Sequence, residues 1–421
     1  MESSEAPVVL MLGLPEGALG GIDLLSFTTT PRFRGVKGIS TGLHFAFASP
    51  TTAFSERHGI WFDITNNGNP PDVIVTQWDA ASEALVRITD ETEILRQRAN
   101  LGSIWNGLTP YRQEVAKTEG DDVEVSSDWS TLTASITPTL LSRLLGNGAD
   151  WKVSSANSSR RDLEDIPGLV DQDLDLQPGE ELHFLPIDLK QTWREGATGR
   201  ERTDAAQDRS WALNNLTHNP LEIIGELQFC FLMILTINNF SCLEQWKRLL
   251  TLLFTCKSAV AEQPDLFIAA IAALRIQLQH CKDAEGGLID LADEGGSLLK
   301  SLLVRFRKGL TGLDAIDVQD VVDELDDLEE YLKQEYGWQF GGSFAKTGLL
   351  ELEDGEQVRM DTTAFDEDDE TGEFAPQVVD LTPEQAKLLG VQDEVDLPQT
   401  LTRTSDESED NQDLEDMDSR Y

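Results

Sequence analysis

The sequence predicts an α+β protein: an N-terminal, mainly antiparallel β domain, a linker, a C-terminal all-α helical domain and an acidic, largely disordered tail. Three observations predict this. The chain has 421 residues, more than usually fold around a single hydrophobic core. The periodicity of its apolar residues changes from strand-like to helical along the chain. Acidic residues are concentrated near its C-terminal end. The predicted parts are a β-rich domain at 1–150, a linker with a short strand at 151–202, a helical domain at 203–340 and the tail at 341–421.

Short apolar runs separated by turn-forming residues occupy the first ninety positions. They are rich in β-branched and aromatic residues, which favours strands at 8–12, 43–47, 59–64 and 73–78. The glycines of 13–21 lack the spacing of a phosphate-binding loop and precede no helix, so a glycine-dependent hairpin is the better interpretation. Short helices are expected around 110–117 and 138–145, the second ending before Gly146.

Polar and turn-forming residues dominate 146–177, which places the domain boundary there. A strand-like stretch at 181–189 precedes a helix expected to begin near Thr203. The helix starting at Pro220 is apolar on every side, as expected of a central, fully buried helix.

Further helices follow this central helix. Ser241 and Glu244 have the spacing of a capping box, and Trp246 lies on the apolar face of the helix behind it. Another apolar helix is expected at 264–280, and the last helix is expected to stop at Gly337.

The charge of the chain limits its partners. It has 76 acidic and 33 basic residues, a formal net charge of −43, which opposes binding to DNA, RNA or anionic membranes and favours a basic protein surface. The N-terminus lacks a signal-peptide pattern and the longest apolar run, 229–237, is too short to span a bilayer, so we expect a soluble protein that is not secreted.

Cysteines and histidines follow no metal-binding or catalytic spacing. Cys230, Cys242, Cys256 and Cys281 are expected to be buried thiols. The sequence therefore predicts no cofactor, no metal and no enzymatic activity.

A small basic cluster, Arg32, Arg34 and Lys37, stands out in the acidic N-terminal domain. One interpretation is structural, with the charges paired to surplus carboxylates and Phe33 in the core. The other is a direct contact to a partner or to RNA.

The tail combines acid with one apolar island. Residues 342–421 contain 24 acidic and 5 basic residues, which predicts disorder in the isolated chain. The island could pair as an added strand with a partner's sheet. Its candidate contact residues are Phe374, Pro376, Val378, Val379 and Leu381. An acidic context makes Thr404, Ser405 and Ser408 candidate phosphorylation sites.

Three segments resemble the Aar family of splicing factors. The first is Gly21-Ile-Asp with Pro31-Arg-Phe-Arg-Gly-Val-Lys37 and Gly42-Leu-His-Phe45. The second is Gly225-Glu-Leu-Gln-Phe229 with Glu244-Gln-Trp-Lys-Arg-Leu-Leu250, and the third, a shorter match, is Phe374-Ala-Pro-Gln-Val-Val-Asp-Leu381. The chain departs from the family pattern by an insertion at 341–372 and an extension at 382–421, which lengthen the tether of the island.

The resemblance implies a non-catalytic assembly factor for the U5 snRNP, present in cytoplasm and nucleus. It implies binding to the RNase H-like and Jab1/MPN domains of the large U5 scaffold protein, which is held in a precursor particle before helicase exchange; other U5 proteins would be bound indirectly. The residues alone leave two alternative functions open: an acidic nuclear adaptor or histone-type chaperone, and an enzyme with an unrecognised interdomain site.

Overall fold

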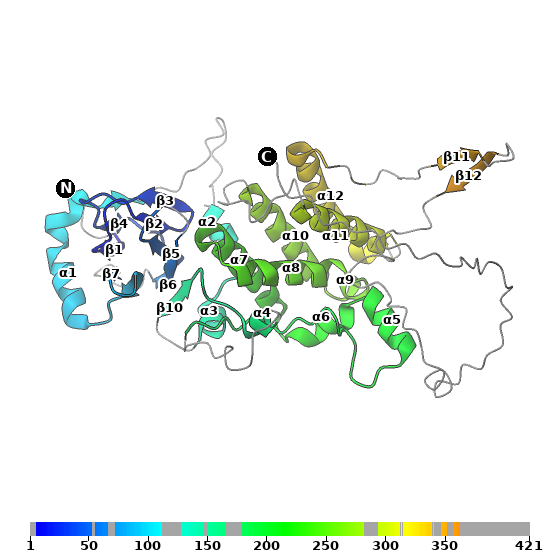
Figure 1. Cartoon of the computed structure of the whole chain (residues 1–421), viewed down its shortest axis with the longest axis horizontal. Helices are drawn as coiled ribbons and strands as arrows, with labels where there is room; N and C mark the ends of the chain where they lie inside the picture. The colour runs from blue at the N-terminus through cyan, green and yellow to red at the C-terminus, as the bar shows by residue number, and fades with distance from the viewer. Residues whose placement is uncertain are drawn as a thin grey trace, which may run out of the picture. The chain divides into compact units, whose positions relative to one another are not determined.

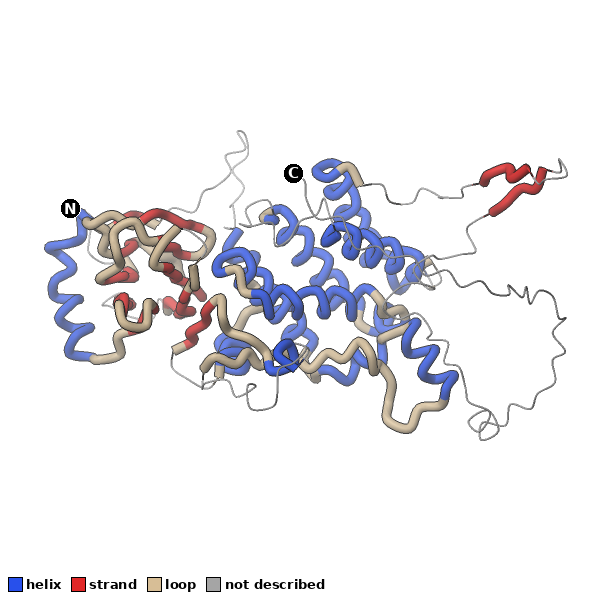
Figure 2. Tube along the Cα trace, viewed as in Figure 1, coloured by secondary structure: helices blue, strands red, loops and turns tan. Residues whose placement is uncertain are grey.

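The computed structural model divides the chain into two compact units, residues 1–342 and 343–421 (Figures 1 and 2). It describes residues 6–52, 55–65, 72–111, 128–146, 150–164, 179–281, 294–311, 313, 315–338, 340, 347–351 and 357–361.

The N-terminal part of the first unit contains two five-stranded sheets. The first has the order β8–β7–β1–β4–β9, with β1 at Val8–Leu12, β4 at Gly35–Lys37, β7 at Val73–Asp79, β8 at Ala84–Arg87 and β9 at Thr109–Pro110. The β1–β7 and β4–β9 pairs are parallel, and the other two pairs are antiparallel.

The second sheet is antiparallel throughout. Its order is β10–β6–β5–β2–β3, with β2 at Leu19–Ile22, β3 at Leu25–Thr28, β5 at Gly42–Ser49, β6 at His58–Ile64 and β10 at Trp151–Ser154. Together the two sheets confirm the mainly antiparallel β domain. The short strand predicted in the linker at 181–189 is wrong, because this segment is extended without being a named strand. Strand β10, at the start of the predicted linker, was not predicted and lies within this sheet.

The glycine-rich segment 13–21 does not form the predicted hairpin. It carries the chain from β1 in one sheet to β2 in the other, and β2 pairs with β3 and β5 instead. A Cβ atom on Gly21 would lie 2.1 Å from the ring of Phe47, so this glycine is required by cross-strand packing rather than by a tight turn.

Helix α1, Glu91–Ile104, follows the strands and was not predicted; Asp90 caps it by accepting a hydrogen bond from the Thr92 amide at 3.0 Å. A 3-10 turn, η1, follows at Trp105–Gly107. The structure contradicts the start of the helix predicted around 110–117, because Pro110 is the last residue of β9. Residues 112–127 lie outside the described residues.

Three short helices come next: α2 at Asp128–Leu132, α3 at Pro138–Leu145 and α4 at Arg160–Glu164. Helix α3 is confirmed where the sequence predicted it. Thr137 caps its N-terminus, and Gly146 follows its end with φ of 88°.

The helical domain is confirmed by a series of packed helices. They are α5 at Gly199–Gln207, α6 at Ser210–Leu216, α7 at Pro220–Ile237, α8 at Phe240–Phe254, α9 at Ser258–Glu262, α10 at Pro264–Gln279, α11 at Glu294–Leu310 and α12 at Ala315–Tyr336. Gly337 follows α12 with φ of 67°, as predicted.

Two predicted helix starts are wrong. Helix α5 begins at Gly199 because Thr198 and Glu201 form a reciprocal capping box, which places Thr203 inside the helix. Helix α8 is capped by Asn239, whose side chain accepts a hydrogen bond from the Cys242 amide at 2.8 Å. Ser241 lies within α8 and has a different partner, described below.

Helix α7 is the central helix, and it packs against α8, α10 and α3 (Figure 1). It is the one described helix long and apolar enough to span a bilayer, but 78% of it is buried inside the molecule. One hydrophobic cluster continues from the second sheet into the helices, with the rings of Trp61 on β6 and Phe229 on α7 centred 6.1 Å apart. The second sheet and the helices thus share a core.

The second unit contains a β-hairpin that the sequence did not predict. Strands β11, Thr347–Glu351, and β12, Gln357–Asp361, pair antiparallel within the predicted insertion.

Candidate functional site

The predicted basic cluster does not act as one group. Arg32 and Arg34 are exposed on the segment before β4. Arg34 donates hydrogen bonds to the main-chain carbonyls of Pro31 and Phe33, at 3.1 and 2.8 Å, and Arg32 makes no polar contact with any described residue. The carboxylate partners expected from a purely structural role are therefore absent for these two arginines among the described residues.

Lys37 has a different environment. Its Nζ atom donates to the carbonyl oxygen of Trp105 at 3.0 Å and lies 5.0 Å from the centre of the Trp105 ring. These contacts join β4 to η1, so Lys37 is a structural residue. Phe33 is partly buried, with its ring centred 4.7 Å from that of Phe27, which agrees with a place beside the core.

The tail candidates lie outside the described residues. This holds for the predicted strand residues Phe374, Pro376, Val378, Val379 and Leu381, and for the candidate phosphorylation sites Thr404, Ser405 and Ser408.

Asp23 and His44, from the first resembling segment, form a buried pair. His44 Nδ1 lies 2.7 Å from Asp23 Oδ2, and the side chains are 1% and 2% exposed. Asp23 has a left-handed backbone, with φ of 56°, and it also accepts hydrogen bonds from the Phe45 amide and the Tyr111 hydroxyl. The pair therefore fixes the turn between β2 and β3 against β5.

Ser40, His44 and Asp23 lie in the order serine–histidine–aspartate of a hydrolytic triad. The Ser40 hydroxyl oxygen lies 3.5 Å from His44 Nε2, whose other ring nitrogen faces Asp23. However, Nε2 is closer, at 3.0 Å, to the carbonyl oxygen of Ser40, which can only accept a hydrogen bond. A ring nitrogen that donates to this carbonyl is not available as a base for the Ser40 hydroxyl, so the geometry does not support a nucleophilic serine.

The second resembling segment lies at the joint between the sheets and the helices. A Cβ atom on Gly225 would lie 2.4 Å from the Ser135 carbonyl oxygen, so only glycine allows α7 to approach the α2–α3 connection this closely. Gln228 binds the same connection from one turn further on. It accepts from the Ser135 amide at 2.8 Å and donates to the Thr131 carbonyl at 3.1 Å.

Glu226, between these two residues, is 0% exposed and fully engaged. It accepts from Arg143 Nη2 of α3 at 2.6 Å, from the Leu185 amide at 3.0 Å and from Gln245 Nε2 of α8 at 2.8 Å. Burial raises the pKa of this carboxyl, while the Arg143 charge and the hydrogen bonds oppose that rise. A buried acid with three donors holds α3, α7, α8 and the extended segment 181–189 together.

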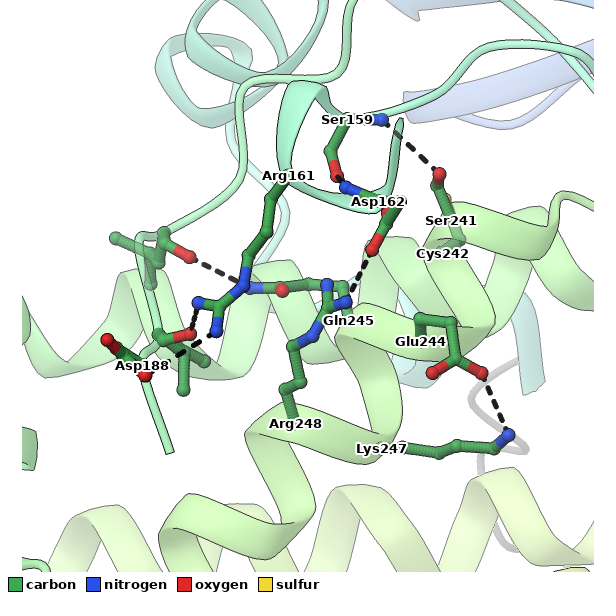
Figure 3. A network of polar contacts seen from close by, with 12 residues as sticks. Ser159, Arg161, Asp162, Asp188, Ser241, Cys242, Glu244, Gln245, Lys247 and Arg248 are labelled. Carbon is green, nitrogen blue, oxygen red and sulfur yellow. Dashed lines mark hydrogen bonds and ion pairs between the residues drawn. The ribbon is translucent and has the colours of Figure 1, made fainter. Parts of the chain in front are cut away.

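A second polar network connects α4 to α8 (Figure 3). Arg248 on α8 forms an ion pair with Asp162 on α4 at 2.5 Å, and both side chains are largely buried. The Ser241 hydroxyl accepts a hydrogen bond from the Ser159 amide at 3.2 Å, which is the partner that replaces the predicted capping box. Arg161, also on α4, donates a hydrogen bond to the Ile187 carbonyl, and its guanidinium lies 3.6 Å from the Asp188 carboxylate.

Asn239 and Arg57 complete the contacts between the two parts. The Asn239 side chain donates to the carbonyls of Ser154, at the end of β10, and Asn157, at 2.9 and 2.8 Å. Arg57, beside β6, donates to the carbonyl of Thr236 near the end of α7 at 2.9 Å. These residues satisfy the polar main chain where sheet meets helix. We call the whole set the domain joint: Arg57, Arg143, Asp162, Gly225, Glu226, Gln228, Asn239, Gln245 and Arg248.

Sequence reasoning named Gly225, Glu226 and Gln228 as part of a resemblance without finding their role. A usable signal was present: an acid in the middle of a helix that is otherwise apolar all round must have a buried partner. The identity of that partner, Arg143, could not be read from the sequence, because it lies 83 residues away.

No group of three or more metal-ligating side chains occurs among the residues that the structure describes. The four cysteines are buried, as predicted. Burial raises the pKa of the Cys230 and Cys256 thiols, which makes them poor nucleophiles.

Comparison with known proteins places both halves of the chain in one family. Residues 5–146 match the family model for the AAR2 N-terminal domain, and residues 184–341 match the model for the AAR2 C-terminal repeat region. Among curated proteins, the human Protein AAR2 homolog is 27% identical over 333 residues, and the mouse homolog is 26% identical over 328; each alignment covers 72% of this chain and 82% of the relative. The Caenorhabditis elegans homolog is 25% identical over 302 residues, covering 65% and 78%. This chain belongs to the AAR2 family.

Proposed function

We propose that this protein is a non-catalytic assembly factor for the U5 snRNP in pre-mRNA splicing. In this proposal it binds the RNase H-like and Jab1/MPN domains of the large U5 scaffold protein and holds that protein in a precursor particle before helicase exchange. It acts in cytoplasm and nucleus, contacts other U5 proteins through the scaffold, and needs neither a cofactor nor direct contact with DNA, RNA or membranes.

The observation that carries the proposal is the match to the AAR2 family over both parts of the first unit. The residues behind the resemblance support a binding role, because they build the fold and the domain joint rather than a reaction centre. Gly225 allows a close helix approach, Gln228 binds main chain, Glu226 binds Arg143, and Asp23 binds His44.

The domain joint also supports the proposed role of holding the scaffold protein, because it fixes the shape of the binding surface. Buried polar contacts such as Glu226–Arg143 and Arg248–Asp162 require specific geometry, so they fix the sheets and helices in one arrangement. A surface that is fixed before binding loses less conformational entropy when it meets a partner.

The remaining partner contacts are part of the same proposal. Arg32 and Arg34 are exposed cations available to a partner, while Lys37 is committed to Trp105. The tail residues Phe374, Pro376, Val378, Val379 and Leu381 are proposed to add a strand to the scaffold. Phosphorylation at Thr404, Ser405 or Ser408 would add negative charge beside that strand.

Affinity purification of the tagged protein from cells that express it at its natural level tests the proposal. We expect the U5 scaffold protein to be enriched and to stay bound in moderate salt. Enrichment of histones or other basic proteins that moderate salt releases would instead indicate an acidic chaperone, and turnover of a small molecule by the purified protein would indicate an enzyme.

A further inference from the structure

A pocket of about 350 Å³ opens at the start of β5, beside the domain joint. It is lined by Ser40, Thr41 and Leu43 at the start of β5, by Asp63 on β6, and by Trp129 and Thr133 of the α2 region. Its volume lies in the range of pockets that hold small ligands or single side chains of a partner.

The polar side chains that line this pocket include one that carries a negative charge, Asp63. Among the residues that the structure describes, the lining also has several hydroxyl groups and no lysine or arginine. Asp63 is partly buried, yet it forms no hydrogen bond or ion pair with any described residue, and the Thr41 hydroxyl is likewise without a partner there. The ring nitrogens of His44 already face Asp23 and Ser40, so this residue does not neutralise Asp63.

An uncompensated carboxylate against apolar walls favours a cation. Leu43, Ile136 and Pro138 lower the local dielectric, which strengthens the attraction of Asp63 for a positive charge. An anionic group, such as a phosphate or another carboxylate, would be repelled there. The formal net charge of −43 adds a long-range attraction for basic partners.

We propose that this pocket binds an arginine side chain of a protein partner. A guanidinium has five donors in a planar fork, which suits a pocket lined by one carboxylate and several hydroxyl groups that can accept, and its aliphatic stem suits the apolar side chains of Leu43 and Pro138. Buried arginines of this kind often dominate the energy of a protein interface.

The test uses the full-length protein with ¹⁵N-labelled tryptophan and the peptide acetyl-Gly-Arg-Gly-amide. The Trp129 indole N–H donates to the Leu43 carbonyl at 2.8 Å and lies at the pocket wall, so its NMR signal, assigned with Trp129→Phe, reports occupancy. We expect a saturable shift with the arginine peptide and at least about tenfold weaker binding of the neutral citrulline analogue.

Variants locate the binding site. Asp63→Asn is expected to weaken arginine-peptide binding at least about tenfold, and Asp63→Lys to abolish it. Glu16→Gln, which removes an exposed carboxylate of the same domain outside the pocket, is the matched control and should leave binding unchanged. The proposal is overturned if the peptide gives no saturable shift, if citrulline binds as well as arginine, or if Asp63→Asn binds as well as the parent.

The arginine–citrulline comparison needs no variant, so the proposal stays testable even if a substituted protein does not fold. No scaffold domain is present in this assay, so its failure would leave the proposed function in U5 assembly untouched.

Discussion

Arg143 of α3 and Glu226 of α7 meet at 2.6 Å, although they are 83 residues apart in the sequence. Glu226 is 0% exposed and Arg143 is 30% exposed, so the acid depends on this single positive charge and on hydrogen bonds for its stability. The contact joins the last helix of the β-rich half to the central helix of the helical half.

Replacing Arg143 with methionine keeps a long apolar side chain but leaves the Glu226 carboxylate without its counter-charge. We expect a loss of about 3 kcal/mol in the free energy of unfolding at neutral pH, because a buried unpaired charge is costly. Denaturant titration measured by circular dichroism checks this. A loss below about 0.5 kcal/mol would contradict a stabilising role for the pair.

The same substitution should change the pH dependence of stability. Burial raises the folded-state pKa of Glu226 above its ordinary value of 4.5, so the folded state binds more protons than the unfolded state over the interval between the two values. Stability from this group is then fully present below the unfolded-state pKa and falls as the pH rises through that interval.

Arg143 limits this fall by attracting the ionised form. The stability deficit of Arg143→Met is therefore expected to be larger at about pH 8 than at about pH 5. The double variant Arg143→Met/Glu226→Gln lacks the titrating group, so its stability deficit relative to Glu226→Gln alone should be independent of pH across this interval. A deficit that is equal at both pH values in the single variant would show that the charge of Glu226 is not its cause.

Gly225→Ala tests the close approach of α7 to the α2–α3 connection. Its Cβ would lie 2.4 Å from the Ser135 carbonyl oxygen and 2.6 Å from Leu140 Cδ2, so backbone must shift and we expect a loss of about 2 kcal/mol or more. Gly102→Ala, in α1 with no atom within 4 Å of the new Cβ, is the control. It should stabilise the protein by about 0.5–1 kcal/mol through helix propensity. Thermal and denaturant unfolding of the two variants should shift in opposite directions.

Trp246 is a core residue of α8, as the sequence predicted. It is 5% exposed, and its indole N–H donates to Gln277 Oε1 of α10 at 2.8 Å. Trp246→Ala is expected to cost about 3–5 kcal/mol, because it creates a cavity and leaves Gln277 without this partner. Trp211→Ala, at an exposed tryptophan of the same domain, should cost about 1 kcal/mol or less in the same denaturation assay. Equal losses in the two variants would contradict the packing described.

Lys37 is bound to Trp105, whereas Arg32 has no polar partner among the described residues, so the two side chains should differ in their effect on stability. Lys37→Met removes the hydrogen bond to Trp105 and the contact with its ring, so a loss of about 1–2 kcal/mol is expected. Arg32→Met should change the free energy of unfolding by no more than about 0.5 kcal/mol, because no described residue contacts that side chain through a polar group. A larger loss for Arg32→Met than for Lys37→Met would reverse the assignment.

Local sequence patterns were sufficient for much of the fold. Apolar periodicity located α7 and α10, and Gly146 and Gly337 marked helix ends. These features depend on residues close together in the chain. Capping was less reliable, because Asn239 and Ser241 can both cap a helix. In the structure Asn239 accepts from the Cys242 amide and caps α8, whereas Ser241 accepts from the distant Ser159 amide.

Sheet membership and the domain joint required the tertiary structure. The segment 13–21 has the glycines of a hairpin, but pairing of β2 with β3 and β5 decides its path. Similarly, β10 lies in a stretch that reads as a linker, and its pairing with β6 supplies the missing edge of the sheet. The pocket around Asp63 and Trp129 combines residues far apart in the chain, so no local sequence motif predicts it.

Binding of the purified protein to a fragment of the U5 scaffold that contains its RNase H-like and Jab1/MPN domains tests the central claim most directly. Isothermal titration calorimetry with the full-length protein and with a variant ending at residue 370 is the measurement. We predict a stoichiometric complex for the full-length protein and at least about tenfold weaker binding for the shortened one, a difference of about 1.4 kcal/mol. Equal affinities would contradict the role of the tail strand, and no binding by the folded full-length protein would contradict the proposed function itself.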